Sequence, residues 1–335
     1  MENNILPPRL KKGKLIGVIA PADPVFGACP EEIINQGCKY LEEKGFSVIL
    51  GDSTKAFSKK HIVTPNSLVI NDINNFIKND NVGCVMAFWG GFNTNRILKN
   101  IDYSLIKKNP KIFIGYSDIT ALTTAITVKT GLITFSGPGV ISFAKPEPFD
   151  YTWEYFEKIC INPRKQTAIS SSLHYADDLY FLREDSNHRI IKNNEGIKIF
   201  NKGRAHGEVV AGNLQTLLAL NGTDFFPDLK NKILFIEEDE TSTPAHVERF
   251  ICQCEQLGWF DKISGLVIGR FTEYSGFSES NPLEDILKTY FLNASFPVMY
   301  NADFGHSDPL ITIPNGGVAI IDTEKKEIVF NQAVL

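Results

Sequence analysis

The side chain with the clearest chemical potential is Ser117, which lies where a short apolar run gives way to a helical pattern. Residues 111–114 predict a buried strand, and Gly115 after them permits a tight turn. The segment from Asp118 predicts a helix that ends at Gly131, a residue suited to the left-handed position after a helix. A serine at this corner suits a nucleophile with half of an oxyanion hole beside it. A serine that only caps the helix would leave the same pattern.

A second candidate is the pair Gly90 and Gly91, within the run Phe-Trp-Gly-Gly-Phe-Asn-Thr-Asn-Arg at residues 88–96. Paired glycines after a strand let the backbone approach a ligand closely, and their amides can point at an oxyanion. Asn93 is a candidate substrate-binding side chain. A plain turn before a helix capped by Asn93 or Thr94 explains the same residues, and the motif alone favours this simpler interpretation.

Four consecutive carboxylates at residues 237–240 form a third candidate, because they directly follow the apolar run 233–236. Packed together and buried, they could not all remain ionised. We therefore expect one of them to have a specific partner such as a histidine. Glu237 is the choice, since it is closest to the rigid strand, and a solvated loop accounts for some of the four.

His306 follows Gly305 in a turn-rich loop, from which a ring can reach a cleft. A lone histidine is more often structural than catalytic. The other histidines lie in polar contexts and are expected at the surface: His61, His174, His188, His206 and His246. Of these, His206 and His246 are the reserve candidates.

The first half of the chain alternates apolar runs with helical patterns. Strands are predicted at residues 15–20, 46–50 and 82–88, and helices at 30–44, 67–79 and from 94. This alternation favours a parallel sheet covered on both faces, in which ligands collect at the carboxyl ends of the strands. Residues 20–23, the Gly90–Gly91 pair and Ser117 all follow strand ends, so they could converge on one crevice.

The pattern weakens between residues 149 and 202, which we interpret as a connection and insertion, with a lid or substrate-binding flap as alternatives. Beyond it, helices are predicted at residues 211–221, 244–257 and 283–290, and strands at 232–236, 263–268, 318–322 and 327–330. The mixture indicates a second α/β or α+β domain. We therefore divide the chain into residues 1–160 and 161–335.

The composition, 43% hydrophobic and 22% charged over 335 residues, is typical of a globular protein of about two domains. A net charge of −5 without a long basic block argues against nucleic acid or an anionic membrane as a partner. No run of about 18 apolar residues or ordered secretory signal is visible. The six scattered cysteines are expected to be buried, reduced thiols, which favours the cytoplasm.

Taken together, these segments resemble the LD-carboxypeptidases and the related microcin C immunity peptidases over nearly the whole chain. The motifs that carry the resemblance are residues 19–21 (Ile-Ala-Pro), 90–96, 114–122 (Ile-Gly-Tyr-Ser-Asp-Ile-Thr-Ala-Leu), 212–214, 222–223, 233–238, 305–306 and 313–316. Two positions depart from the family pattern. Ala22 and Asp23 stand where the family often has serines, and Glu238 follows Glu237 where many relatives have Glu-Asp.

The resemblance implies a flavodoxin-like N-terminal domain and a mixed α/β C-terminal domain, with the active site in the cleft between them. It implies that Ser117 is the nucleophile, His306 the general base and Glu237 the acid that orients it, with Glu238 as the alternative acid. The oxyanion hole would use the amides of Asp118 and of the Gly90–Gly91 pair. The resemblance also implies a homodimer that needs no metal or other cofactor.

Three functions stay open at this point. The first is a serine carboxypeptidase that cleaves the L,D amide bond of a muropeptide. The second is a microcin-type hydrolase that cleaves a peptide–nucleotide bond, with Tyr180 and Phe181 as candidates for stacking on the base; the composition of residues 149–202 leans towards this branch. The third is a catalytically silent binding protein on the same scaffold. The intact set of serine, glutamate and histidine argues against the third.

Overall fold

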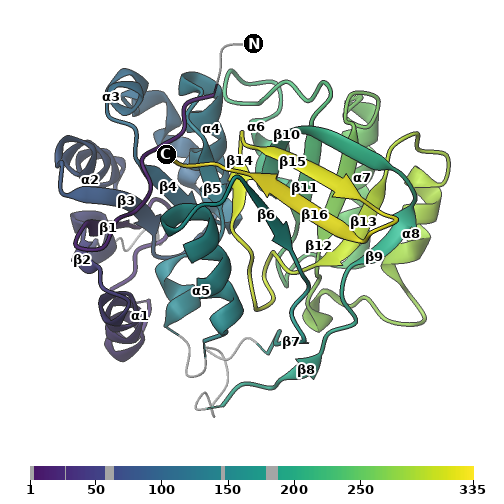
Figure 1. Cartoon of the computed structure of the whole chain (residues 1–335), viewed down its shortest axis with the longest axis horizontal. Coiled ribbons are helices and arrows are strands. Elements are labelled where there is room, and N and C mark those ends of the chain that lie inside the picture. Colours follow the sequence, from purple (N-terminus) through teal and green to yellow (C-terminus); the bar gives the residue numbers. More distant parts are fainter. Residues whose placement is uncertain (1–3, 27, 57–63, 145–147, 179–187) are drawn as a thin grey trace.

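Two β-sheets with helices packed around them form the protein (Figure 1). The computed structural model describes residues 4–26, 28–56, 64–144, 148–178 and 188–335. Within these ranges no helix combines the length and the apolar character needed to cross a membrane. All six cysteines carry free thiols; four are buried, whereas Cys38 and Cys252 are half-buried.

The first sheet has six strands, and all neighbours pair in parallel except the edge strand β14, which is antiparallel to β5. Its strands, in spatial order, are β14 (Ile313–Asn315), β5 (Thr134–Ser136), β4 (Ile112–Gly115), β3 (Val82–Ala87), β1 (Leu15–Ile19) and β2 (Ser47–Leu50). The division of the chain after residue 160 stays a prediction. The strand β14 lies C-terminal to this boundary in the sequence, yet it forms an edge strand of the first sheet.

Alternate side chains of the first sheet enter two apolar cores, as expected for a sheet covered on both faces. In β3, Val85 and Ala87 pack on the face covered by α2 (Asn66–Lys78), α3 (Tyr103–Lys108) and α4 (Thr120–Thr130). Cys84 and Met86 pack on the opposite face, with α1 (Glu31–Glu43) and α5 (Asp150–Phe156). This second core continues into the C-terminal sheet, so the two halves share one apolar interior.

The second sheet has eight strands, with a parallel centre of four and antiparallel strands on both sides. In spatial order they are β6 (Gln166–Ile169), β16 (Glu327–Asn331), β15 (Val318–Asp322), β10 (Arg204–Asn213), β11 (Ile233–Glu237), β12 (Gly265–Gly269), β13 (Val298–Ala302) and β9 (Lys198–Asn201). Its outer face packs against α6 (Leu214–Leu220), α7 (Pro244–Gln256) and α8 (Leu283–Phe291). A separate pair, β7 (His174–Tyr175) and β8 (Lys192–Asn193), lies at its edge (Figure 1).

The predicted α/β architecture with a mainly parallel first sheet and a mixed second sheet is confirmed, but two interpretations were wrong. The helix predicted from residue 211 begins only at Leu214, because residues 211–213 end the buried strand β10 and Asn213 caps the helix by accepting from Thr216 N at 3.0 Å. Residues 149–202 were interpreted as a connection and insertion, but their described part contains α5, β6 and β9, and both strands belong to the second sheet. Their pattern is weak because α5 is short and both strands lie at sheet edges, where β6 buries Thr167 but exposes Ala168 and the side chains of β9 are all half-buried.

Candidate active site

Ser117 occupies the turn between β4 and α4, with a backbone φ of +61°. This left-handed conformation is uncommon for a residue with a side chain and costs of order 1–3 kcal/mol, so the surrounding structure must hold it in place. A short 3-10 helix, Ser117–Ile119, leads into α4, and Gly131 ends that helix at φ +74°, as predicted. The corner therefore presents the serine hydroxyl at the carboxyl end of the first sheet.

Gly90 packs directly against this serine. A Cβ atom at position 90 would lie 2.8 Å from Ser117 Cβ and 3.3 Å from the amide nitrogen of Asp118. The next residue, Gly91, has φ +142° and leaves no room for a side chain beside Asp23, where a Cβ would lie 2.7 Å from the carboxyl carbon. The predicted approach of the paired glycines to the serine corner is thus present in the structure.

With Ser117 as the nucleophile that the resemblance implies, we expect Gly90→Ala to lower kcat/KM about 100-fold, because the added methyl group would displace the Ser117 hydroxyl by a fraction of an ångström or more. Gly131→Ala is the matched control: a Cβ there meets no atom within 4 Å, so only backbone strain at φ +74° is added. The control should lower the melting temperature while kcat/KM stays near wild type. Equal activity in the two variants would show that the close packing at Gly90 is unimportant.

His306 connects the serine to the acidic run. Its Nε2 lies 3.0 Å from Ser117 Oγ, and its Nδ1 lies 2.6 Å from Glu237 Oε2. Glu237 is the last residue of β11 and is buried. Gly305 and Gly269 lie against it, and a Cβ at either position would approach Glu237 Cβ to 3.0 Å. Three side chains from distant parts of the sequence are therefore brought into one hydrogen-bonded chain.

Glu238, the alternative acid, points elsewhere. Its Oε1 accepts from the amide of Gln215 at 2.6 Å, and its Oε2 accepts from Ser242 Oγ at 2.8 Å. It thereby satisfies a free amide in the first turn of α6. Burial, followed by the charge of Glu237, raises the pKa of Glu238 to about 7. In the structure Glu237, not Glu238, contacts the imidazole.

The acidic run makes the histidine strongly basic. Burial alone would lower the pKa of His306, but the charge and hydrogen bond of Glu237, with smaller contributions from Glu240 and Asp239, raise it to about 9. The four carboxylates thus differ in role: one contacts the ring, one caps a helix, and two act on the ring through charge. All the described histidines outside this site are exposed, as predicted: His174, His188, His206 and His246.

Two further carboxylates lie beside the glycine pair. Asp118 is buried and accepts a hydrogen bond from Thr94 N at 2.7 Å. Burial raises its pKa, although the hydrogen bonds from Thr94 oppose this change. Burial and the nearby charge of Asp118 raise the pKa of Asp23 to about 6. The Asp118 side chain thereby ties Thr94, in the segment after β3, to the serine corner.

An open pocket of about 210 Å³ adjoins the serine. Its walls come from the glycine loop, the serine corner, the start of α6 and the acidic run: Gly91, Phe92, Asn95, Ser117, Asp118, Asn213, Gln215, Thr216, Ala219 and Asp239. Asn93 is not among these lining residues, although its neighbours Phe92 and Asn95 are. Tyr180 and Phe181 lie outside the described residues. The polar residues of α6 were missed because the helix was predicted to start three residues early, which hid its N-terminus.

This geometry can perform acyl transfer. A hydroxyl that contacts one nitrogen of an imidazole can give up its proton as it attacks a carbonyl carbon, and a carboxylate on the other nitrogen fixes the tautomer and stabilises the charged ring. Catalytic triads whose members follow one another along the chain in the order serine, acid, histidine are known in another fold, the α/β-hydrolases. Within the described part of the chain, no three histidine, cysteine or carboxylate side chains gather in a way that could hold a metal ion.

Comparisons with known proteins define the family. Residues 16–137 match the model of the LD-carboxypeptidase N-terminal domain, and residues 206–321 match that of the LD-carboxypeptidase C-terminal domain. The chain is 33% identical to the probable murein peptide carboxypeptidase of Bacillus subtilis (strain 168), over 99% of this chain and 96% of that protein. It is 32% identical to the microcin C7 self-immunity protein MccF of Escherichia coli, over 97% and 95% of the two chains. The chain therefore belongs to the LD-carboxypeptidase family, which is a family of peptidases.

Solved structures agree with this assignment. An MccF-like protein from Bacillus anthracis str. Ames has a TM-score of 0.91 and 35% identity, covering 98% of this chain and 99% of the other. MccF in complex with aspartyl sulfamoyl adenosine has a TM-score of 0.91 and 29% identity, covering 99% of this chain and all of the other. The family resemblance drawn from the motifs is confirmed.

Proposed function

We propose that this protein is a serine carboxypeptidase in which Ser117 is the nucleophile, His306 the general base and Glu237 the residue that orients the ring. The observation that carries this proposal is the double contact of His306, 3.0 Å from Ser117 Oγ and 2.6 Å from Glu237 Oε2. The left-handed φ of +61° at Ser117 supports it further, because backbone strain of this kind is concentrated at functional corners.

In the proposed reaction, Ser117 Oγ attacks the carbonyl carbon of the scissile amide while His306 Nε2 accepts the hydroxyl proton. The amide of Asp118 and one amide of the Gly90–Gly91 pair donate hydrogen bonds to the resulting oxyanion. The ring then donates its proton to the leaving amine, the C–N bond breaks and an acyl-enzyme remains. A water molecule, deprotonated by the same ring, hydrolyses the ester and restores the serine.

The substrate that we propose is a muropeptide, cleaved at the L,D amide bond before a terminal D-alanine. The 33% identical relative from Bacillus subtilis named as a murein peptide carboxypeptidase supports this choice, since it matches 99% of this chain. The alternative is a peptide–nucleotide or aminoacyl–nucleotide bond. It is supported by the 32% identity to MccF and by the structure of MccF with aspartyl sulfamoyl adenosine.

Purified protein should be incubated with a tetrapeptide muropeptide and, separately, with an aminoacyl-nucleotide analogue whose scissile bond is hydrolysable. We expect release of D-alanine from the first at a higher kcat/KM than cleavage of the second. The reverse ranking would assign the protein to the microcin-type reaction. Absence of hydrolysis of both, with no labelling by a fluorophosphonate, would contradict the proposed serine chemistry.

The raised pKa of His306 gives a pH dependence. Only the neutral ring can accept the serine proton, so kcat/KM should rise about tenfold per pH unit below pH 9 and level off above it. Because the charges of Asp239 and Glu240 contribute to this shift, the double variant Asp239→Asn/Glu240→Gln should move the midpoint to lower pH. A kcat/KM profile with a midpoint near 6.5 in the wild type would contradict the predicted coupling to the acidic run.

We further propose that the enzyme acts in the cytoplasm as a homodimer. The six free cysteines support a reducing compartment. Light scattering coupled to gel filtration should give about twice the mass of the chain, and a mass equal to one chain would contradict the dimer.

A further inference from the structure

Two buried carboxylates bracket His306: Asp303 lies three residues before it and Asp308 two residues after it. Each is held by a buried arginine from another part of the chain. We propose that these arginines, Arg270 and Arg189, are positioning residues, which act through the two carboxylates to fix the backbone of residues 303–308, here called the histidine loop. This inference rests on the proposed function, because it concerns the base of that same site.

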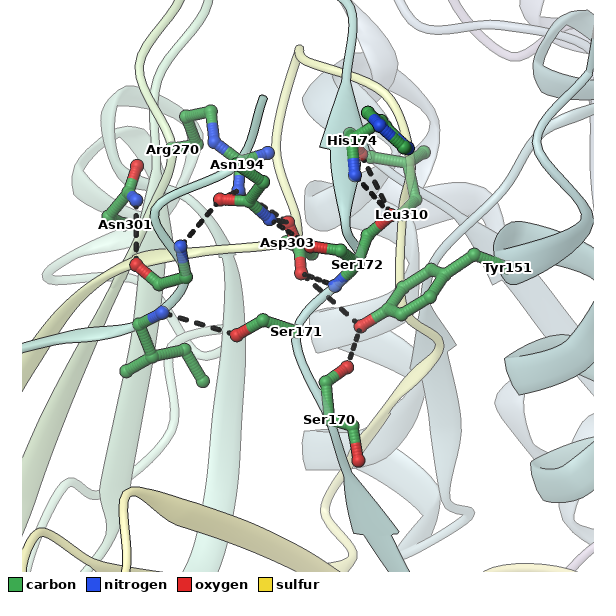
Figure 2. Close-up of polar contacts among 12 residues, drawn as sticks. Tyr151, Ser170, Ser171, Ser172, His174, Asn194, Arg270, Asn301, Asp303 and Leu310 are labelled. Atoms are coloured by element: carbon green, nitrogen blue, oxygen red, sulfur yellow. Dashed lines mark hydrogen bonds and ion pairs between the residues drawn. The ribbon is translucent and has the colours of Figure 1, made fainter. Parts of the chain in front are cut away.

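Asp303 lies at the centre of a network of polar contacts (Figure 2). Its Oδ1 accepts hydrogen bonds from Arg270 and, at 3.0 Å, from Asn194 Nδ2, and its Oδ2 accepts from the amide of Ser172 at 2.8 Å. Arg270 also donates to Asn194 Oδ1 at 2.9 Å. Its guanidinium lies 4.6 Å from the centre of the Tyr175 ring. Donors from three separate segments therefore meet at one carboxylate.

On the other side of His306, Asp308 is held through both its backbone and its side chain. Its amide and carbonyl pair with those of Ala176 at 2.8 and 2.9 Å. Its Oδ2 accepts from Arg189 Nη2 at 2.9 Å, and Arg189 Nε donates to Asp178 Oδ1 at 2.9 Å. The side chain of Arg189 is only 2% exposed.

One structural unit supplies most of these contacts. We use the name clamp hairpin for residues 171–178 and 188–194, which include the paired strands β7 and β8. It contributes four residues to the contacts that hold Asp303 and Asp308, namely Ser172, Ala176, Arg189 and Asn194. Arg270 lies outside the hairpin and directly follows β12. Both ends of the histidine loop are thus tied to the same hairpin.

This arrangement suits positioning better than stability. A buried ion pair adds little net stability, because desolvation of both charges offsets their attraction, but it fixes geometry strictly. His306 must keep both ring nitrogens within hydrogen-bond distance of fixed partners, and an error of about 1 Å in such an alignment can cost about 100-fold in rate. The loop itself contains Gly305 at φ +110°, and ordering a glycine costs more backbone entropy than ordering any other residue.

The test compares Arg189→Gln, Arg189→Lys and Arg270→Lys with the control Lys192→Gln. Lys192 lies in the same hairpin and pairs with Asp177 at 2.7 Å and Glu273 at 2.6 Å, neither of which belongs to the histidine loop. The readouts are kinact and KI for a fluorophosphonate, the pH midpoint of kinact/KI, and circular dichroism to establish folding.

We expect Arg189→Gln to lower kinact by 10- to 100-fold with KI changed less than threefold, and to move the pH midpoint below that of wild type, since a displaced ring loses its close contact with Glu237. Both lysine variants should fall between this variant and wild type, because lysine keeps the charge without the planar fork. Lys192→Gln should match wild type. A loss of packing alone would change the melting temperature but not the pH midpoint.

The proposal is overturned if the folded arginine variants react at the wild-type rate with the wild-type midpoint, or if Lys192→Gln slows kinact as much as they do. If Arg189→Gln does not fold, the two lysine variants decide, and wild-type values in both contradict the proposal. Failure of the proposed function is distinguishable, because the wild-type protein itself would then not be labelled at Ser117.

Discussion

Replacing Ser117 by alanine is expected to lower kcat by about 10⁴-fold or more on whichever substrate the wild type hydrolyses. The reason is the loss of the attacking oxygen, which His306 Nε2 contacts at 3.0 Å. The measurement is single-turnover and steady-state hydrolysis of the muropeptide and of the aminoacyl-nucleotide analogue. The fold should persist, because alanine retains the Cβ that packs beside Gly90.

Ser280→Ala is a suitable control, since Ser280 is exposed and its hydroxyl lies 3.1 Å from that of another exposed serine, Ser278. It should retain wild-type kcat and KM. Substantial hydrolysis by the Ser117→Ala variant would remove this hydroxyl from the mechanism and would favour a water nucleophile or a different site.

The second large effect concerns the neighbouring glutamates. Glu237→Gln should lower kcat about 10⁴-fold, because an amide cannot stabilise the charged ring and can select the wrong tautomer. It should also lower the pKa of His306 from about 9 towards its usual value, since Glu237 is the main cause of the rise. Steady-state kinetics at several pH values measure both effects.

Glu238→Gln is the matched variant one residue away. Glu238 does not contact the ring; it accepts hydrogen bonds from the Gln215 amide and Ser242 Oγ, and burial, which disfavours the charged form, raises its pKa to about 7. We therefore expect kcat within a few-fold of wild type. If Glu238→Gln were the inactive variant and Glu237→Gln the active one, the assignment of the orienting acid would be reversed.

The sequence was most informative where local rules suffice. The corner at Ser117 follows from a buried strand, a turn glycine and a helix ended by Gly131, and the structure has each of these elements in place. The alternating strands and helices of the first half likewise follow from periodicity. The association of Ser117, Glu237 and His306 did not follow from local pattern, because they are separated by more than 60 residues at each step. The family motifs supplied it.

The long-range polar contacts could not be predicted from the sequence. Arg270, Asp303 and Asn194 are scattered through segments that have no helical or strand signature, and nothing in their neighbourhoods indicates that they meet. Edge strands were missed for a related reason: β6 buries Thr167 and exposes Ala168, so its hydropathy does not follow its alternating burial, and every side chain of β9 is half-buried. The short strands β5 and β14 have three residues each, which is too few for a periodic signal.

The most direct test is to locate the covalent adduct formed with a fluorophosphonate by peptide mass spectrometry. One phosphonyl group per chain should be found on Ser117, and its rate of attachment should increase with pH up to about 9, as the ring of His306 loses its proton. His306→Asn should slow the attachment by several orders of magnitude. An adduct on another residue, or attachment to Ser117 at an undiminished rate without His306, would contradict the proposed activation of this hydroxyl.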